Sequence, residues 1–328
     1  TNQAYNDKAF EHLNKVRGLK NYHSNYNVEF LRTLVLLEKF NQAFNFSKKI
    51  WTEDELFFEA DLLLGLDYFI KKDYINAEKH FERLNIISRN NLIFDNFIGN
   101  ILIAWSKAAQ GNEKESHNFI KKIPRNYNHL KNAQHIFLKC YFDNVDTQKA
   151  IQKLVGDKEF NFSRYNFFLI NYLLSVNKIE QAKKVIKNSR KKYSSNLLLK
   201  QTELFFNKER KKIGKFFNCK NPKDPLGEFF YVIANLYASE NEYRLSNMYL
   251  KISQFLNKNF LSNETLLAEN LYYQEKNNES KKVYYSIKSI GSIYSWHASK
   301  NIASILLDEK GVKYAVKILE KDFNLLVD

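Results

Sequence analysis

A small residue recurs in this chain about every 34 positions, and this period restricts the fold more than any other feature. Ala9, Ala43 and Ala77 are separated by steps of 34 residues. Beyond Ala77, steps of 32 to 39 residues reach further small residues, namely Ser116, Ala150, Ala182, Gly214, Ser246, Ser280 and Ala315. A period of this size is typical of repeat proteins, in which each repeat is one supersecondary unit.

The spacing within a unit predicts two antiparallel helices. The residue twelve positions before the small residue is itself small in five units, where it is Gly65, Ala104, Ala234, Ala268 or Ala303. Helices approach most closely where their side chains are smallest, so each such pair indicates a helix crossing. Polar patches such as Lys72-Asp73 and Asn277-Asn278 precede the second helix and are typical of helix ends.

Composition favours the same fold class. The chain has 9 Gly and 3 Pro in 328 residues, too few for a turn-rich β fold, and 44% hydrophobic residues, enough for a packed core. We expect an all-α protein with one domain over residues 1–328, about nine and a half helix pairs, and a longer connection near 219–227 containing Pro222 and Pro225. The alternative is an irregular bundle of unrelated amphipathic helices. Ten small residues in phase favour the repeat.

One unit resembles a known family. The stretch 57–91 has Gly65, Tyr68, Ala77 and Phe81 where a tetratricopeptide repeat of 34 residues has its consensus residues. The segment 99–105, followed by Gly111, looks like uncharacterised tetratricopeptide proteins of alphaproteobacteria, which implies a bacterial source. The early Trp and most terminal Pro residues of the family pattern are absent. The resemblance implies a right-handed superhelical solenoid.

The resemblance also implies a function, a non-catalytic scaffold that binds a peptide or partner protein in the concave groove lined by first helices. It places these residues on or near the groove: Arg32, Glu59, Leu66, Trp105, His135, Lys139, Arg164, Asn171, Glu203, Tyr231, Asn235, Glu269, Tyr272, His297 and Lys300. Asn171 and Asn235 are candidates to hold a peptide backbone through paired amide hydrogen bonds. The alternative is that both are solvated. The Lys that some members carry four residues earlier is replaced here by Phe167 and Tyr231.

Charge supports an alternative function. The net charge is +15, which hints at nucleic acid or an anionic surface, but the abundance of Lys, Asn, Ile, Phe and Tyr also fits codon bias. RNA or anionic-surface binding through the Lys-rich region 183–223 is therefore the second hypothesis. Its candidate residues are Lys183, Lys184, Lys187, Arg190, Lys191, Lys192, Arg210, Lys211 and Lys212. The first of them lie on the outward face of a second helix, without the interleaved aromatics of a single-strand platform.

Catalytic and metal-binding motifs are absent from the sequence. The seven His residues form no HExxH spacing, and there is no GxGxxG or phosphate-binding loop. We therefore expect no enzyme activity, no cofactor and no metal site; a degenerate-repeat enzyme is the third hypothesis. Cys140 and Cys219 lie on different units outside any disulfide-framework spacing, and they leave the redox compartment open.

Localisation and self-association follow from the apolar pattern. No run reaches the ~18–20 apolar residues of a membrane span, so we expect a soluble protein of the cytoplasm or periplasm. Ala9 marks a second helix whose first helix is missing, and no polar capping helix follows Ala315. Terminal repeats need a polar outer face, so we expect a longer array, or a partner or second copy that covers an uncapped end.

Overall fold

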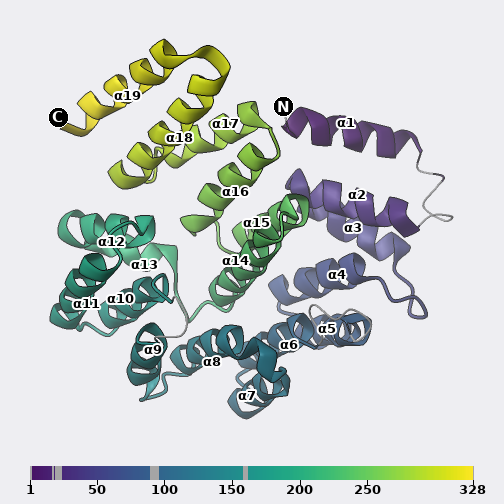
Figure 1. Cartoon of the computed structure of the whole chain (residues 1–328). Helices are drawn as coiled ribbons and strands as arrows, with labels where there is room; N and C mark the ends of the chain where they lie inside the picture. Colours follow the sequence, from purple (N-terminus) through teal and green to yellow (C-terminus); the bar gives the residue numbers. More distant parts are fainter. Residues whose placement is uncertain (1, 17, 19–23, 89–95, 158–161, 328) are drawn as a thin grey trace. The chain divides into compact units, whose positions relative to one another are not determined.

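The computed structural model describes residues 2–16, 18, 24–88, 96–157 and 162–327. Nineteen α-helices and no strands are found in this part of the chain (Figure 1). The helices are α1 (Asn2–Lys15), α2 (Ser24–Leu36), α3 (Phe40–Ile50), α4 (Phe58–Ile70), α5 (Tyr74–Ser88), α6 (Ile98–Ala109), α7 (Glu113–Lys122), α8 (Asn128–Tyr141), α9 (Thr147–Val155), α10 (Tyr165–Ser175), α11 (Ile179–Lys192), α12 (Leu197–Lys208), α13 (Ile213–Phe216), α14 (Lys223–Ser239), α15 (Tyr243–Leu256), α16 (Ser262–Tyr273), α17 (Asn277–Ile287), α18 (Ser292–Lys310) and α19 (Val312–Val327).

Helices that follow one another in sequence pack as antiparallel pairs, for example α4 with α5, α16 with α17 and α18 with α19. First helices also contact the first helices of the next pair, as α2 does with α4, α6 with α8 and α10 with α12. A single helix pair leaves apolar surface on its outer faces, and stacking on a neighbour buries it. The all-α fold class and the helix-pair organisation are confirmed.

The small residues in phase lie at buried positions of second helices. Ala43, Ala77, Ser116, Ala182, Ser246 and Ser280 have no exposed surface, and Ala315 is buried. The hydroxyl of Ser280 donates a hydrogen bond of 2.8 Å to the carbonyl oxygen of Ala268, its expected partner twelve residues earlier. Contact of a side chain with the opposing backbone requires a close helix crossing, which is why larger residues do not occupy these positions.

The turns within the helix pairs repeat at the same phase. In six helix pairs, the residue five positions before the small residue has a positive φ of 58° to 83°. These residues are Glu38, Lys72, Gly111, Asn177, Asn241 and Glu275. The amide of Lys72 donates to Phe69 O, and the next amide donates to Tyr68 O. This pattern is a Schellman motif, which ends a helix through one left-handed residue and satisfies its last carbonyl groups. The polar breaks of the sequence are therefore helix C-caps.

The chain divides into two compact units. Unit 1 comprises residues 1–2, 148–218 and 230–328, and unit 2 comprises residues 3–147 and 219–229. Each unit is described by itself below. The expected single domain of about nine and a half helix pairs stays a prediction.

Three of the small residues are not buried as the period predicts. Ala9 of α1 is half-buried. Gly214 is exposed in the four-residue helix α13, and a Cβ added to it would meet no atom within 4 Å. Ala150 is half-buried, whereas Thr147 and Ile151 of the same helix are buried. Helix α13 has only four residues, and the buried face of α9 runs through Thr147 and Ile151, so the assigned register was wrong at Gly214 and Ala150.

The proline-containing connection is shorter than expected. It spans residues 217–222, and α14 begins at Lys223 with Pro225 in its first turn. Proline is tolerated there because the first amide groups of a helix have no intrahelical acceptor. Within unit 1 the array is also not purely nearest-neighbour, since α12 contacts α18. Gln201 of α12 accepts a hydrogen bond of 3.2 Å from the amide of Ile293.

The two cysteines are joined. Cys140 of α8 and Cys219 of the 217–222 connection form a disulfide within unit 2, with Cα atoms 5.9 Å apart and a sequence separation of 79. Lys220, next to Cys219, donates to the carbonyl oxygen of Tyr141 at 2.8 Å. The helix end and the connection are therefore bound to each other at two adjacent points, a pairing that residue spacing did not indicate.

Candidate functional site

A cleft of about 230 Å³ in unit 1 brings together four residues assigned to the groove, Arg164, Tyr231, Asn235 and Glu269. It is lined by residues at or just before the first helices α10, α12, α14, α16 and α18 and by no second helix. We call it the first-helix cleft, and its lining residues are Arg164, Asn196, Leu197, Leu198, Tyr231, Asn235, Ser262, Thr265, Leu266, Glu269 and Tyr294.

Stacked aromatic rings position the charged group at one wall of the cleft. The guanidinium carbon of Arg164 lies 3.8 Å from the ring centre of Tyr231 and 4.5 Å from that of Phe260. The two rings are themselves packed edge to face, with centres 5.7 Å apart. A guanidinium group stacks well on aromatic faces because it is planar and weakly hydrated. Arg164 is thus held in place while it remains half-buried at the cleft.

A carboxyl group and an amide lie on two further helices of the cleft. Glu269 of α16 is half-buried, and burial raises the pKa of its carboxyl group. Asn235 of α14 donates to the carbonyl oxygen of Tyr231, one turn earlier, at 3.1 Å. This hydrogen bond uses one amide proton and orients the side chain. The cleft therefore combines a cation, an anion and an amide over a partly apolar surface.

Several cleft residues were missed by the sequence analysis. Thr265 lies four residues before Glu269, on the same face of α16, and Ser262 lies one turn further back. Helical spacing from Glu269 was the signal that could have found both. Asn196 caps α12 by accepting a hydrogen bond of 3.1 Å from the amide of Leu199. No sequence signal pointed to Tyr294, which is buried on α18 and reaches the cleft through packing alone.

The remaining groove residues of unit 1 lie elsewhere. Asn171 is buried and donates to the carbonyl oxygens of Ile213 and Phe217 at 3.1 and 2.9 Å. Its amide thus binds the chain itself, and we leave it out of the proposed contact surface. Tyr272 is 37% exposed on α16 but does not line the first-helix cleft.

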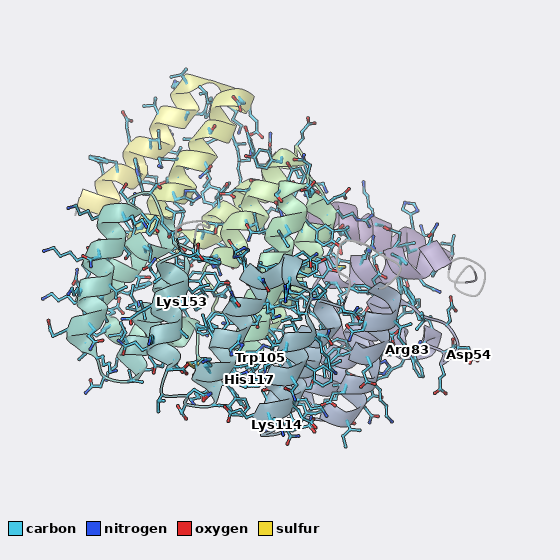
Figure 2. The ribbon with its side chains drawn as sticks, turned by 60° about the horizontal axis from the view of Figure 1, so that its bottom comes forward. Asp54, Arg83, Trp105, Lys114, His117 and Lys153 are labelled. Atoms are coloured by element: carbon cyan, nitrogen blue, oxygen red, sulfur yellow. A yellow bond between two sulfur atoms is a disulfide. The ribbon has the colours of Figure 1, made fainter. Side chains whose placement is uncertain are left out.

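The groove residues of unit 2 are divided among the four helices α2, α4, α6 and α8. Arg32 of α2 pairs with the buried carboxylate of Glu59 at 2.6 Å. Trp105 of α6 (Figure 2) has no exposed surface and donates to Gln134 Oε1 at 2.8 Å. Trp105 therefore belongs to the core and offers no surface to a partner, so it is not part of the proposed contact surface.

His135 and Lys139 lie together on α8. The His135 ring packs on that of His117 (Figure 2) from α7, with centres 4.8 Å apart. Burial, reinforced by the His117 and Lys139 charges, lowers the pKa of His135 to about 4. Lys139 forms an ion pair with Asp146. These contacts link consecutive helices of unit 2.

A buried carboxylate network near Arg83 is structural. Asp61 of α4 has no exposed surface and accepts hydrogen bonds of 2.9 Å from Trp51 Nε1, His80 Nδ1 and Arg83 Nε. Arg83 also donates to backbone carbonyl groups of residues 52, 53 and 55, and it lies beside the loop that carries Asp54 (Figure 2). The network therefore attaches this loop to α4 and α5. Within the described ranges, no three His, Cys, Asp or Glu residues could hold a metal ion together.

The basic residues assigned to region 183–223 are mostly exposed. Lys183, Lys184, Lys187, Lys191 and Lys192 are exposed on the second helix α11. Three members of the set carry internal contacts. Arg190 pairs with Glu203 at 2.9 Å, Lys212 pairs with Glu209 at 2.8 Å, and Arg210 stacks on Phe206. Arg210 and Lys211 lie in the 3₁₀ turn that precedes α13.

Comparisons with known proteins add little to this picture. The sequence matches no protein-family model and no curated protein. Among solved structures, it is similar to a chain of the crystal structure of the APC/C hetero-tetramer Cut9-Hcn1, with 12% identity and a TM-score of 0.28 over 98% of this chain and 78% of that chain. At this TM-score the two backbones do not superpose closely, and the all-α fold is defined by the helix packing described above. None of the described helices is long and apolar enough to cross a membrane.

Proposed function

We propose that this chain is a non-catalytic scaffold that binds a polypeptide in the first-helix cleft of unit 1. The observation that carries the proposal is the meeting of Arg164, Tyr231, Asn235 and Glu269 from three first helices at one cleft. Consecutive first helices that share a surface form a continuous strip, which suits an extended peptide.

The chemistry of the cleft favours a peptide with a basic side chain. Glu269 is partly removed from water, and its raised pKa reflects the cost of holding a charge there. A Lys or Arg side chain of the ligand would offset this cost through a charge-assisted hydrogen bond. Arg164 would donate hydrogen bonds to a carbonyl or carboxylate oxygen of the same peptide, and the side-chain oxygen of Asn235 would accept one from a backbone amide. Binding should therefore weaken as the pH falls through the raised pKa of Glu269, because protonation removes the anion.

Selection of random peptides displayed on phage against the immobilised full chain tests the proposal. Enriched peptides would be synthesised, and their binding measured by fluorescence anisotropy against the variants Asn235→Ala and Glu269→Gln. The matched controls are Asn188→Ala and Glu180→Gln, the same changes at exposed positions of α11. We expect the cleft variants to weaken binding roughly tenfold and the controls less than about twofold. No enrichment, or equal binding by all four variants, would refute the cleft as a peptide site.

RNA or anionic-surface binding through region 183–223 remains the alternative function. The five exposed lysines on α11 support it. Charge-driven RNA binding falls steeply with salt, so anisotropy of labelled oligo(U) between low and physiological salt separates the two functions. A sequence-selective RNA complex that persists at physiological salt would favour the alternative.

A further inference from the structure

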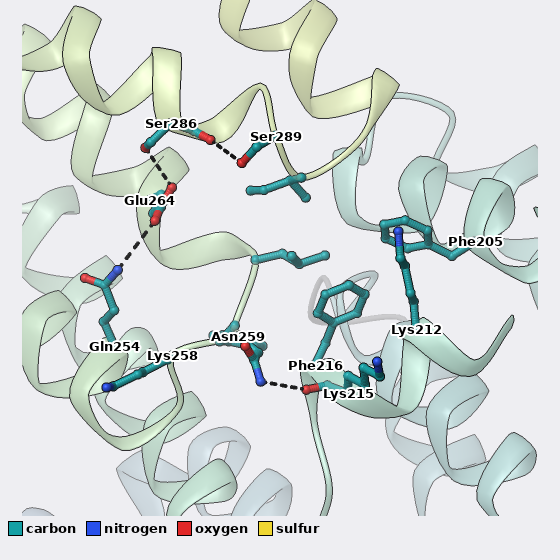
Figure 3. Close-up of a pocket in the computed structure, with 13 residues that line it drawn as sticks. Phe205, Lys212, Lys215, Phe216, Gln254, Lys258, Asn259, Glu264, Ser286 and Ser289 are labelled. Atoms are coloured by element: carbon teal, nitrogen blue, oxygen red, sulfur yellow. Dashed lines mark hydrogen bonds between the residues drawn. The ribbon is translucent and has the colours of Figure 1, made fainter. Parts of the chain in front are cut away.

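A second pocket of unit 1, of about 440 Å³, is lined by residues of the second helices α13, α15 and α17 and the turns beside them, with Phe205 and Glu264 from the first helices α12 and α16 (Figure 3). We call it the lysine pocket. Its lining residues are Phe205, Lys212, Lys215, Phe216, Gln254, Lys258, Asn259, Phe260, Leu261, Glu264, Ser286, Ser289 and Ile290. The volume is within the range of roughly 300–1,000 Å³ that ligand sites occupy. It shares no residue with the first-helix cleft.

The pocket wall is assembled from two segments distant in sequence. Asn259 donates to the carbonyl oxygen of Lys215 at 3.2 Å, and Asn257 donates to that of Phe216 at 2.9 Å. These side-chain amides attach the turn after α15 to α13. The short, irregular helix α13 thus has a role in the structure, because it presents Lys215 and Phe216 to the turn that carries Lys258.

Charge is unbalanced at this pocket. Three lysines line it, and Lys212 alone among them forms a described ion pair, with Glu209. The ammonium groups of Lys215 and Lys258 make no ion pair within the described part of the chain, and both residues are exposed. The single lining carboxylate, Glu264, accepts hydrogen bonds from Gln254 and Ser286 on the opposite side of the pocket from Lys215 (Figure 3). An anionic ligand would supply the opposite charge that Lys215 and Lys258 lack within the described part of the chain.

The floor of the pocket is apolar and mostly buried. Phe205, Phe260 and Leu261 are buried, while Phe216 and Ile290 are half-buried. The rings of Phe205 and Phe216 lie with centres 5.3 Å apart and a tilt of 33°. A floor of this kind accepts an apolar side chain, whereas base stacking needs freely exposed ring faces. A nucleotide therefore fits less well than a peptide anchor.

We infer that the lysine pocket binds an acidic peptide segment whose single apolar side chain enters the Phe205–Ile290 floor while flanking carboxylates meet Lys215 and Lys258. The inference rests on the proposed scaffold function, because it gives the same unit a second polypeptide contact of opposite charge preference. Binding energy at protein interfaces is concentrated in a few anchor side chains that fill desolvated pockets. Charged residues at the edge of the interface select the partner.

The test uses a fluorescein-labelled peptide of sequence Asp-Glu-Asp-Phe-Asp-Glu-Asp and the full chain, read by fluorescence anisotropy. Comparison probes are the same peptide with Ala or with Lys in place of Phe, labelled oligo(U), and vesicles of phosphatidylglycerol. The double variant Lys215→Glu/Lys258→Glu, called the rim variant, reverses the charge of the two exposed lysines of the pocket. The α11 variant, Lys183→Glu/Lys184→Glu, makes the same charge change on α11. All four lysines are exposed, and circular dichroism confirms that each variant is folded.

We expect the Phe peptide to bind at least about tenfold more tightly than the Ala or Lys peptides. The rim variant should weaken it by about tenfold or more and the α11 variant by less than about twofold. Equal loss in both variants, equal binding of the Ala peptide, tighter binding of oligo(U) or vesicles, or no binding at millimolar peptide would each overturn the inference. Glu269→Gln should leave this binding unchanged, so failure of the first-helix cleft and failure of the lysine pocket are separate results.

Discussion

Replacing Gly65 by alanine should destabilise the α4/α5 pair, because the position tests whether small residues are required at helix crossings. A Cβ added to Gly65 would lie 2.2 Å from Cε1 and 2.6 Å from Cδ1 of Phe81. Non-bonded carbon atoms prefer about 3.5–4.0 Å. Phe81 has no exposed surface, so its ring cannot turn into solvent to avoid the new methyl group, and the two helices must separate instead.

The magnitude follows from two opposing terms. Overpacking a core costs about 1–3 kcal/mol, and the upper end applies here because the closest approach falls more than about 1 Å short of ordinary contact. Alanine in a helix interior is more favourable than glycine by about 1 kcal/mol. We therefore expect Gly65→Ala to lower the free energy of unfolding by about 2 kcal/mol.

Urea denaturation followed by tryptophan fluorescence measures this change, since Trp51 and Trp105 lie in the same unit as Gly65. The control is Gly214→Ala, at a helical glycine where an added Cβ would meet no atom within 4 Å; its stability should be equal to or slightly above that of the wild type. Phe81→Leu combined with Gly65→Ala should cost less than the sum of the single changes, because leucine frees space beside the methyl group. An unchanged midpoint for Gly65→Ala, or strict additivity, would show that the crossing is not where the reasoning places it.

Three further predictions concern single contacts. Cys140→Ser with Cys219→Ser should destabilise unit 2 by up to about 4.5 kcal/mol in the loop-entropy model, given the separation of 79 residues; reductant should reproduce the loss in wild type and leave the variant unaffected in urea titrations. Glu275→Gly should raise the free energy of unfolding by about 0.5–1 kcal/mol, since Glu275 has φ of 58°; a lower urea midpoint would contradict this. The pKa of His135 is lowered to about 4 from an ordinary 6.5, so the unfolded chain takes up the proton at a higher pH than the folded chain does. Stability should therefore fall as the pH drops from about 6.5 to 4. His135→Gln should flatten that part of the profile of melting temperature against pH.

Local features of the fold were accessible from the sequence. The period of small residues, the polar breaks before each second helix and the apolar spacing predicted helix pairs, and the buried positions of Ala43, Ala77 and Ala182 follow that phase. The prediction failed at Gly214, where the second helix has only four residues, and at Ala150, which lies beside the buried Ile151. A period measured from one residue type cannot reveal that a helix is shortened, because a small residue occurs as readily on an exposed turn as at a crossing.

The candidate site was accessible only in part. Family resemblance selected Arg164, Tyr231, Asn235 and Glu269, which the structure brings to one cleft. It also selected Asn171 and Trp105, which packing buries. All six lie on first helices or at their ends, and the sequence pattern there shows which residues share a helix but not which neighbour covers them.

Most helix pairs and the polar breaks at their turns could be predicted from the sequence alone, because capping and amphipathic periodicity depend on residues within one or two turns of each other. The tertiary structure alone decided the rest. The side-chain amide of Asn171 donates to carbonyl groups more than 40 residues away, at Ile213 and Phe217, and Asn259 donates to the carbonyl oxygen of Lys215 across a similar separation. Such long-range hydrogen bonds depend on how whole helices stack. Stacking is set by the summed packing of many side chains rather than by any local pattern.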